Sequence, residues 1–219
     1  MARAALKTTN RKRTASKEER QEQLIQATIR SVASRGLSDT TMATVSSEAG
    51  LSQGIINLHF QSKQRLLVAT LRHLADEYRA GWEQAVAKAG ADPADRLAAS
   101  VAADFAPLVC HRDKLAVWFA FWGESKSRPT YRRICAERDR TDREAIVTLC
   151  RALIRHGGYA GIDADTVAAT LSAMTAGLWL DLLTRPRTID RGQANAICTA
   201  YLAATFTRHF PRPEPGATR

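Results

Sequence analysis

The sequence predicts an all-α protein, and three observations support that prediction. Apolar residues recur at three- and four-residue steps along most of the 219-residue chain. β-Branched residues are scattered and never alternate over a useful length, so strand signals are nearly absent. Gly and Pro stand at intervals where helices of ordinary length end. We expect two helical units, a short N-terminal one and a larger C-terminal one, joined by a long helix.

Residues 17–35 predict the first helix. Its apolar face is formed by Leu24, Ile25, Ile29 and Val32. Gly36 is expected to end it as a C-terminal glycine. Residues 1–16 precede the helix and carry several Lys and Arg but no acidic residue, which predicts a disordered basic arm.

Two short helices are expected next. Thr40 or Thr41 can cap the first of them, which ends at Gly50. Ser52 is positioned to cap the free backbone N–H groups of the second, which runs from Gln53 to about His59. These helices complete a first domain of residues 17–64.

A long helix follows over residues 62–88, and the second domain is expected over residues 65–209. The long helix has a buried stripe of Leu66, Leu67, Thr70, Leu71, Leu74, Tyr78 and Trp82. Further helices are expected at 93–109, 113–125, 130–156, 163–184 and 190–208. The nine helices leave a Pro-rich tail, residues 210–219, which predicts disorder.

Composition and charge exclude several protein classes. The longest apolar run is Leu115–Trp122, far short of the roughly twenty residues that a membrane span needs, and the start lacks the apolar core of a signal peptide. We therefore expect a cytoplasmic protein whose four separated cysteines are buried thiols rather than metal ligands. The net charge is +10, half of it within the first 64 residues, and favours a nucleic acid partner.

The stretch 40–63, TTMATVSSEAGLSQGIINLHFQSK, has the pattern of a helix-turn-helix. Gly50 permits the tight turn, and the second helix fits a DNA major groove. Gly54 leaves room in that helix for close approach to DNA, where Ser52 caps its start. Gln53, Asn57 and His59 carry side chains that can bond bases or phosphates. The same spacing also fits an αα corner of any helical protein.

The motif A-G-L-S-x-G…H-F-x-x-K, with the basic start, chain length and helix count, resembles the TetR family of bacterial one-component regulators. The resemblance implies phosphate contacts from Thr41, His59 and Lys63. It implies that base contacts come from the recognition helix: Gln53, Asn57 and Leu58. The sequence departs from the family at Asn57, where a phosphate-binding Tyr is usual, and at Ile55, where Thr is usual, so the contacts of that Tyr and that Thr do not carry over to this chain. The family resemblance also argues against a transit peptide, since the amphipathic segment from residue 17 matches the family's first helix.

A narrower resemblance is carried by GIINLHFQSK, WFAFWGESKSRPTYRRICAERDR and the A-x-x-x-GLWL of residues 173–180. These segments are similar to the choline-responsive BetI repressors. The resemblance implies a dimeric repressor of glycine-betaine synthesis or transport genes that choline or a related quaternary ammonium releases from its double-stranded operator. A TetR-type regulator of another ligand, or a ligand-independent DNA-binding factor on the same fold, stays an alternative.

Clustered aromatic residues in the second domain are candidates for a cage around such a cation. The candidate ligand-binding residues are Phe105, Trp118, Phe121, Trp122 and Trp179. The candidate counter-charges are Asp104, Glu124 and Asp181. Plain core packing is the alternative for every one of these aromatic side chains.

Residues 130–156 alternate in charge, with Arg138, Asp139 and Asp142 among their members, and are expected to form a solvated helix face. The last two predicted helices carry more apolar surface than one layer can hide, which predicts a homodimer. An enzyme is not expected: the chain has no HExxH or phosphate-loop motif, and neither a catalytic residue nor a cofactor or metal site is predicted.

Overall fold

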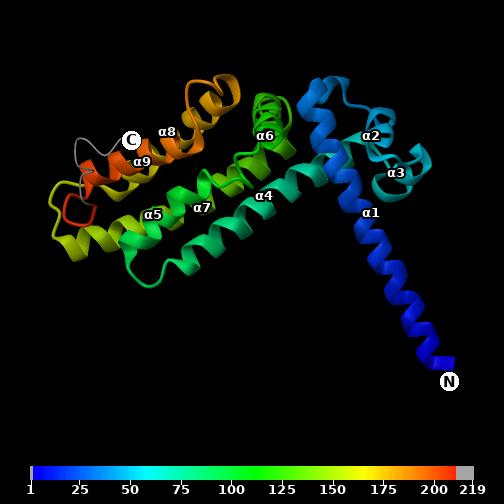
Figure 1. The fold of residues 1–219 in the computed structure, drawn as a ribbon, viewed down its shortest axis with the longest axis horizontal. Helices are drawn as coiled ribbons and strands as arrows, with labels where there is room; N and C mark the ends of the chain where they lie inside the picture. The colour runs from blue at the N-terminus through cyan, green and yellow to red at the C-terminus, as the bar shows by residue number, and fades with distance from the viewer. Residues whose placement is uncertain (1, 211–219) are drawn as a thin grey trace. The chain divides into compact units, whose positions relative to one another are not determined.

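The structure is a computed structural model that describes residues 2–210, with side chains described from Lys17 onward. Nine helices and no strand occur in that range, as the all-α prediction requires (Figure 1). They are α1 (Ala2–Asp39), α2 (Met42–Ala49), α3 (Gln53–Phe60), α4 (Lys63–Lys88), α5 (Pro93–Asp104), α6 (Arg112–Glu124), α7 (Pro129–Gly157), α8 (Ala164–Thr184) and α9 (Arg191–Thr205).

The helix boundaries differ from the predicted ones at two places that matter. α1 begins at Ala2, within the stretch predicted as an arm; the arm's side chains and residues 211–219 of the predicted tail lie outside the described residues. α5 ends at Asp104 rather than at residue 109. Pro107 explains this early end, because it disfavours helical geometry at the residue before it and cannot donate to the turn behind.

The chain divides into two compact units. The first comprises Met1–Leu74 with Ala116–Tyr131, and the second comprises Ala75–Leu115 with Arg132–Arg219. The first unit therefore extends past residue 64, where we expected a domain boundary, into the first half of α4. No Gly or Pro interrupts α4 near that residue, so the helix runs on from one unit into the other.

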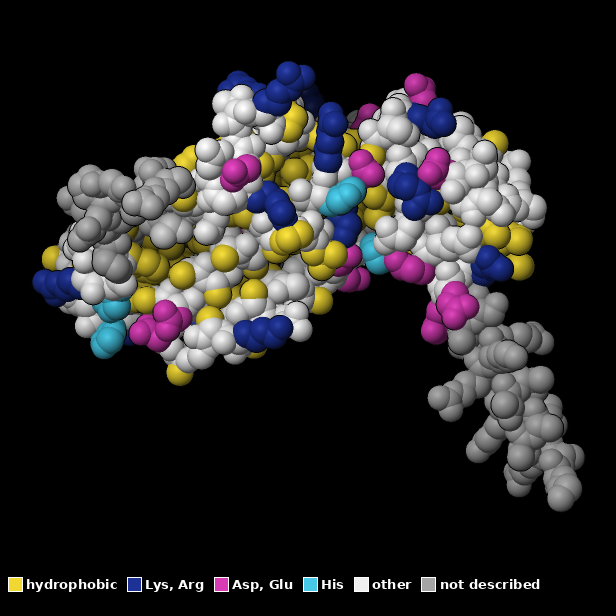
Figure 2. All heavy atoms as spheres, in the orientation of Figure 1, with side chains coloured by type: hydrophobic (Ala, Val, Ile, Leu, Met, Phe, Trp, Pro, Cys, Tyr) yellow, Lys and Arg dark blue, Asp and Glu magenta, His cyan; other side chains and the backbone are white. Residues whose placement is uncertain are grey.

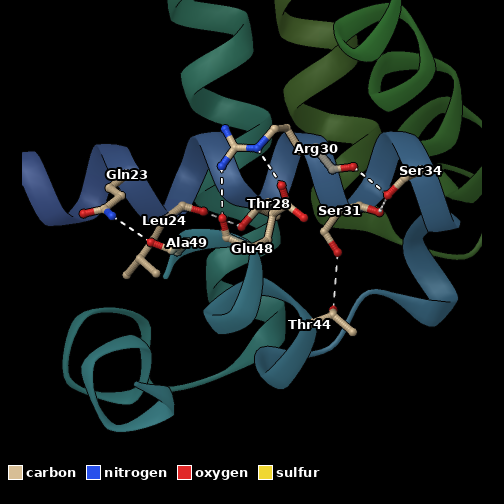
Figure 3. A network of polar contacts seen from close by, with 9 residues as sticks. All are labelled: Gln23, Leu24, Thr28, Arg30, Ser31, Ser34, Thr44, Glu48 and Ala49. Carbon is tan, nitrogen blue, oxygen red and sulfur yellow. Dashed lines mark hydrogen bonds and ion pairs between the residues drawn. The ribbon is translucent and has the colours of Figure 1, made fainter. Parts of the chain in front are cut away.

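In the first unit α1 holds α2 in place through polar contacts (Figure 3). Gln23 Nε2 donates to the carbonyl oxygen of Ala49 at 2.8 Å, and Arg30 Nε pairs with Glu48 Oε1 at 2.8 Å. The buried core between the first helices comprises Leu24, Ile29, Val32, Val45, Ile56 and Phe60. Gly36, with φ of 80°, interrupts α1 where the sequence placed the end of the first helix.

The second unit packs α9 against α5 and α8, and α8 and α9 lie side by side (Figure 1). Its largest buried side chains include Trp179, Phe206, Leu97 and Leu153. Among the described residues, α8 alone has the length and composition of a membrane-crossing helix, which is weak evidence for a span. Only 22% of its apolar window is buried in the single chain. Hydrophobic side chains also reach the visible surface of this unit (Figure 2).

Candidate DNA interface and effector site

A tight turn joins α2 to α3. Gly50 adopts the left-handed conformation, with φ of 65° and ψ of 31°, and its N–H donates to the carbonyl oxygens of Ser46 and Ser47. The N–H of Leu51 then bonds the Ser46 carbonyl oxygen at 2.9 Å. This closure of the helix end follows the glycine that the sequence placed there, and it is the geometry of a helix-turn-helix.

α3 presents one polar face and one buried face. Ile56 and Phe60 are buried in the first unit, whereas Gln53, Gly54 and Asn57 are exposed. Leu58 is 78% exposed, the highest value among the large hydrophobic side chains described as exposed. A leucine in that state on a short helix is available to a partner, as the predicted base contact requires.

Thr41 and Ser52 take different roles at the starts of the two helices. Thr41 forms a capping box with Thr44: its hydroxyl accepts from the Thr44 N–H at 3.1 Å, and the Thr44 hydroxyl accepts from the Thr41 N–H at 2.8 Å. Ser52 stands at the N-cap position of α3 but makes no side-chain capping bond, so the expected cap is wrong. Its exposed hydroxyl is left for another acceptor or donor.

Lys63 is engaged within the protein. Its ammonium donates to the carbonyl oxygens of Leu37 at 2.7 Å and Ser38 at 3.0 Å, at the end of α1. It also lines a pocket of about 370 Å³ whose other lining residues include Arg128 and Tyr131. His59 is half-buried, and its buried Nδ1 has no hydrogen-bond partner among the described residues. The predicted phosphate contact of Lys63 therefore competes with its bonds to the end of α1, whereas the predicted contact of His59 meets no competing hydrogen bond at Nδ1 from the described residues.

The five aromatic residues predicted as a cage fall into the two units. Trp118, Phe121 and Trp122 lie in the first, where Phe121 is fully buried against Tyr131 in an edge-to-face contact with ring centroids 4.8 Å apart. Phe105 and Trp179 lie in the second. Of the candidate counter-charges, Glu124 and Asp181 pair with Arg128 and Arg185, which stand four residues later and just beyond the ends of α6 and α8. Asp104 instead lies at the centre of a buried cluster.

Asp104 gathers side chains from two other helices of the second unit. At the end of α5, its Oδ1 accepts a hydrogen bond of 2.6 Å from the hydroxyl of Tyr78 on α4. Its Oδ2 accepts one of 3.2 Å from Thr175, and its backbone carbonyl oxygen accepts one of 2.9 Å from Trp179 Nε1, both on α8. The rings of Tyr78 and Trp179 meet edge to face, with centroids 6.1 Å apart.

Arg138 completes the cluster from α7. Its guanidinium carbon lies 4.8 Å from the centroid of the Tyr78 ring and 5.5 Å from that of Trp179. Nη2 pairs with Asp139 at 2.8 Å, and Nε lies 3.6 Å from Asp142. Arg138 is only 9% exposed, so the expected solvated face of this helix is wrong at this residue. Charge alternation in a sequence does not distinguish a buried guanidinium from an exposed one.

Burial controls the ionisation of the cluster. It raises the pKa of Asp104 to about 6, against the lowering effects of the Tyr78 hydrogen bond, the Arg138 charge and the Thr175 hydrogen bond. Burial likewise raises the pKa of Asp142 to about 6 and that of the nearby Cys110 thiol to about 12. At neutral pH Asp104 is thus a buried carboxylate beside two aromatic rings, while Cys110 stays a neutral thiol.

The sequence had identified some members of this cluster. Trp179 and Asp104 were candidates, and Tyr78 was expected only as part of a buried stripe. Arg138 was missed, because its sequence context is that of an exposed charged helix. The one sequence feature that sets Arg138 apart is that the residue four positions before it is not acidic. This feature is too weak to identify Arg138 as buried.

Comparison with known proteins agrees with this architecture. Residues 24–70 match the model of bacterial regulatory proteins of the tetR family, and residues 93–207 match the model of the BetI-type transcriptional repressor C-terminal domain. The HTH-type transcriptional regulator BetI of Burkholderia thailandensis is 36% identical over 191 residues, which cover 78% of this chain and 96% of that protein. BetI of Serratia proteamaculans is 32% identical over 193 residues, covering 88% and 95%.

Solved structures show the same fold. A transcriptional regulator from Pseudomonas aeruginosa PAO1 superposes with a TM-score of 0.77 at 29% identity, covering 88% of this chain and 94% of that one. A regulator from Saccharomonospora viridis, solved in complex with choline, gives 0.73 at 26% identity, covering 84% and 96%. The matched families and curated relatives are transcriptional regulators and not enzymes.

Proposed function

The chain belongs to the TetR family of transcriptional regulators, in the group with a BetI-type C-terminal domain, and we propose that choline or a close quaternary ammonium relative releases it from its operator. The genes it controls are, on this proposal, those of glycine-betaine synthesis or transport. The observation that carries the effector assignment is the Asp104 cluster. A carboxylate buried beside the rings of Tyr78 and Trp179 supplies both the negative charge and the aromatic faces that a quaternary ammonium needs.

The first unit supports the DNA-binding half of the proposal. The turn at Gly50 sets α3 after α2, and the exposed face of α3 carries Gln53, Asn57 and Leu58. Gln53 and Asn57 carry amide groups, which can form two hydrogen bonds to one base, and Leu58 is an apolar group that can contact a thymine methyl. Thr41 and Ser52 lie exposed at the two helix starts, where contacts to phosphate fix the register of a protein on DNA.

The second unit supports a homodimer built on α8 and α9. Leu180 on α8 and Ile197 on α9 are each 45% exposed in the single chain. A second copy that covers these helices would hide the apolar surface, and a twofold dimer presents two recognition helices to two half-sites. A regulator of this kind acts in the bacterial cytoplasm at the nucleoid, where its operator lies.

Coupling between effector and DNA follows from α4. The helix starts at Lys63 in the first unit, and its Tyr78 bonds Asp104 in the second. A ligand that prefers one arrangement of the cluster shifts α4 toward that arrangement, and operator affinity changes with it. By linkage, DNA must weaken effector binding by the same factor.

The test is fluorescence anisotropy on labelled DNA from upstream of the protein's own gene, titrated with choline chloride at fixed ionic strength. We expect choline to release the DNA at micromolar to millimolar concentration, while sodium chloride replacing choline does not. If the protein binds this DNA and choline changes nothing, the effector assignment is wrong. The protein is then a regulator of another ligand or a ligand-independent DNA-binding factor.

A further inference from the structure

We propose that Tyr78, Trp179 and Asp104 form a cation seat that Arg138 of the same chain occupies, and that a quaternary ammonium effector binds by displacing the Arg138 guanidinium. The inference rests on the proposed function, because it assigns a place to the effector within the second unit. It adds an internal competitor for that place.

The geometry of the rings defines the seat. The guanidinium carbon of Arg138 lies 4.8 Å from the Tyr78 centroid and 5.5 Å from the Trp179 centroid. Both distances are within the roughly 6 Å over which a cation is attracted to an aromatic face. The two rings stand at 82° to each other, so they offer two walls to one charge. One cation between two such walls is the arrangement that recognises a quaternary ammonium ion.

The carboxylate of Asp104 gives the cation seat its negative charge. Its oxygens are hydrogen-bonded by the neutral hydroxyls of Tyr78 and Thr175, which orient the carboxylate without cancelling its charge. A buried carboxylate is costly unless a cation compensates it. Arg138 supplies that compensation in the present structure, and any ligand that takes its place must carry a positive charge too.

Arg138 also pairs with one carboxylate that lies toward solvent. Its Nη2 and Nε both bond Asp139 Oδ1, at 2.8 and 3.1 Å, and the Asp139 side chain is 51% exposed. A guanidinium that leaves the rings therefore keeps a carboxylate partner. A quaternary ammonium has no N–H group to donate, so it cannot form the hydrogen bonds that the guanidinium makes with Asp139, whereas it is attracted to the ring faces. The guanidinium is stabilised by hydrogen bonds to a carboxylate, whereas the quaternary ammonium is stabilised by the ring faces. Exchange of one cation for the other therefore leaves each beside the groups that stabilise it.

The exchange gives the effector a mechanical consequence. Arg138 is on α7, whereas Tyr78 is on α4 and Trp179 is on α8. While the guanidinium stands against both rings it holds α7 to the other two helices. Its displacement removes that tie and leaves α4, which continues into the first unit, in contact with the ligand instead.

The experiment measures binding of tetramethylammonium chloride to the full-length protein by calorimetry and by the shift of the thermal unfolding midpoint, with sodium chloride at equal ionic strength as the salt control. We expect R138A to bind tetramethylammonium at least ten-fold more tightly than the wild type. R138K keeps a cation at the position and should stay within three-fold of the wild type. R140A removes an exposed arginine from the same helix and should leave the affinity unchanged.

Equal affinity of R138A and wild type for tetramethylammonium would overturn the proposal. Should R138A not fold, R138Q, which keeps most of the side-chain volume but not the charge, replaces it with the same expected gain. Operator release by choline separates this proposal from the proposed function. Choline release by the wild type with no gain in R138A retains the function and refutes the seat. A gain in R138A with no choline release retains the seat and refutes the function.

Discussion

The indole Nε1 of Trp179 donates a hydrogen bond of 2.9 Å to the backbone carbonyl oxygen of Asp104, 75 residues earlier in the chain. The bond ties α8 to the last turn of α5 and fixes the polar edge of the indole against the backbone. The Arg138 guanidinium lies over the ring, 5.5 Å from its centroid, and the Asp104 side chain is left to Tyr78 and Thr175. One residue thus contributes its backbone to the geometry of the site and its carboxylate to the charge.

The raised pKa of Asp104 predicts a dependence of stability on pH. Its pKa is about 6 in the folded protein against an ordinary value of 3.8, so between these values the folded state binds more protons than the unfolded state. This contribution is fully present below pH 3.8 and is lost as pH rises through about 6. We expect lowering the pH from 7.5 to 5.0 to raise the urea unfolding midpoint of the wild type more than that of D104N. Identical pH profiles for the two proteins would contradict the assignment.

Two glycines should respond to alanine in opposite directions. Gly50 has φ of 65°, which alanine adopts only with strain, so G50A should lower the free energy of unfolding by about 1 kcal/mol. Gly81 lies inside α4, and a Cβ there meets nothing within 4 Å, so G81A should raise it by about 0.5–1 kcal/mol. Denaturant unfolding of both variants checks the pair, and a stabilising G50A would be incompatible with the turn.

Lys63 is expected to stabilise the first unit. K63M removes the charged donor from the carbonyl oxygens of Leu37 and Ser38, which should cost about 1.5 kcal/mol of unfolding free energy. R35M, at an exposed position of α1, serves as the control and should change little. If K63M weakens DNA binding without lowering stability, the ammonium acts on phosphate and not on the end of α1.

Leu58 should matter for DNA sequence preference alone. It is 78% exposed, so L58A should leave the unfolding midpoint unchanged while lowering operator affinity several-fold. Affinity for random DNA, which depends on phosphate contacts, should hardly change. L108A removes a leucine that is 48% exposed in the turn after α5 and should affect neither. Anisotropy on operator and random duplexes measures both affinities; equal losses on the two would refute base recognition by Leu58.

The proposed dimer surface can be tested by introducing charge. L180E and I197E each place a carboxylate on an apolar position of α8 or α9, where a partner helix would have to bury it. We expect both variants to be monomers by light scattering and to lose at least ten-fold in operator affinity, because two half-sites must be bound together. L108E is the matched control. Dimers that persist in both variants would place the interface elsewhere.

The sequence by itself determined the elements and the class of the protein. Apolar spacing located the helices, and Gly36 and Gly50 marked two of the helix ends, because glycine alone adopts their positive φ without cost. The motif around Gly50 predicted the DNA-binding half together with the exposed positions of Gln53 and Leu58. These features are local, so neighbouring residues in the chain contain the information.

Only the tertiary structure decided how the proposed effector site is composed. Trp118 and Trp122 had the more conspicuous spacing, yet the described cluster joins Trp179 to Tyr78, Asp104 and Arg138 from four separate helices. Arg138 has the sequence surroundings of a surface residue, and it is buried because α4 and α8 place two rings beside it. Burial, and with it the raised pKa of Asp104 and the cation–π geometry, depends on contacts between residues far apart in sequence, which helical periodicity does not encode.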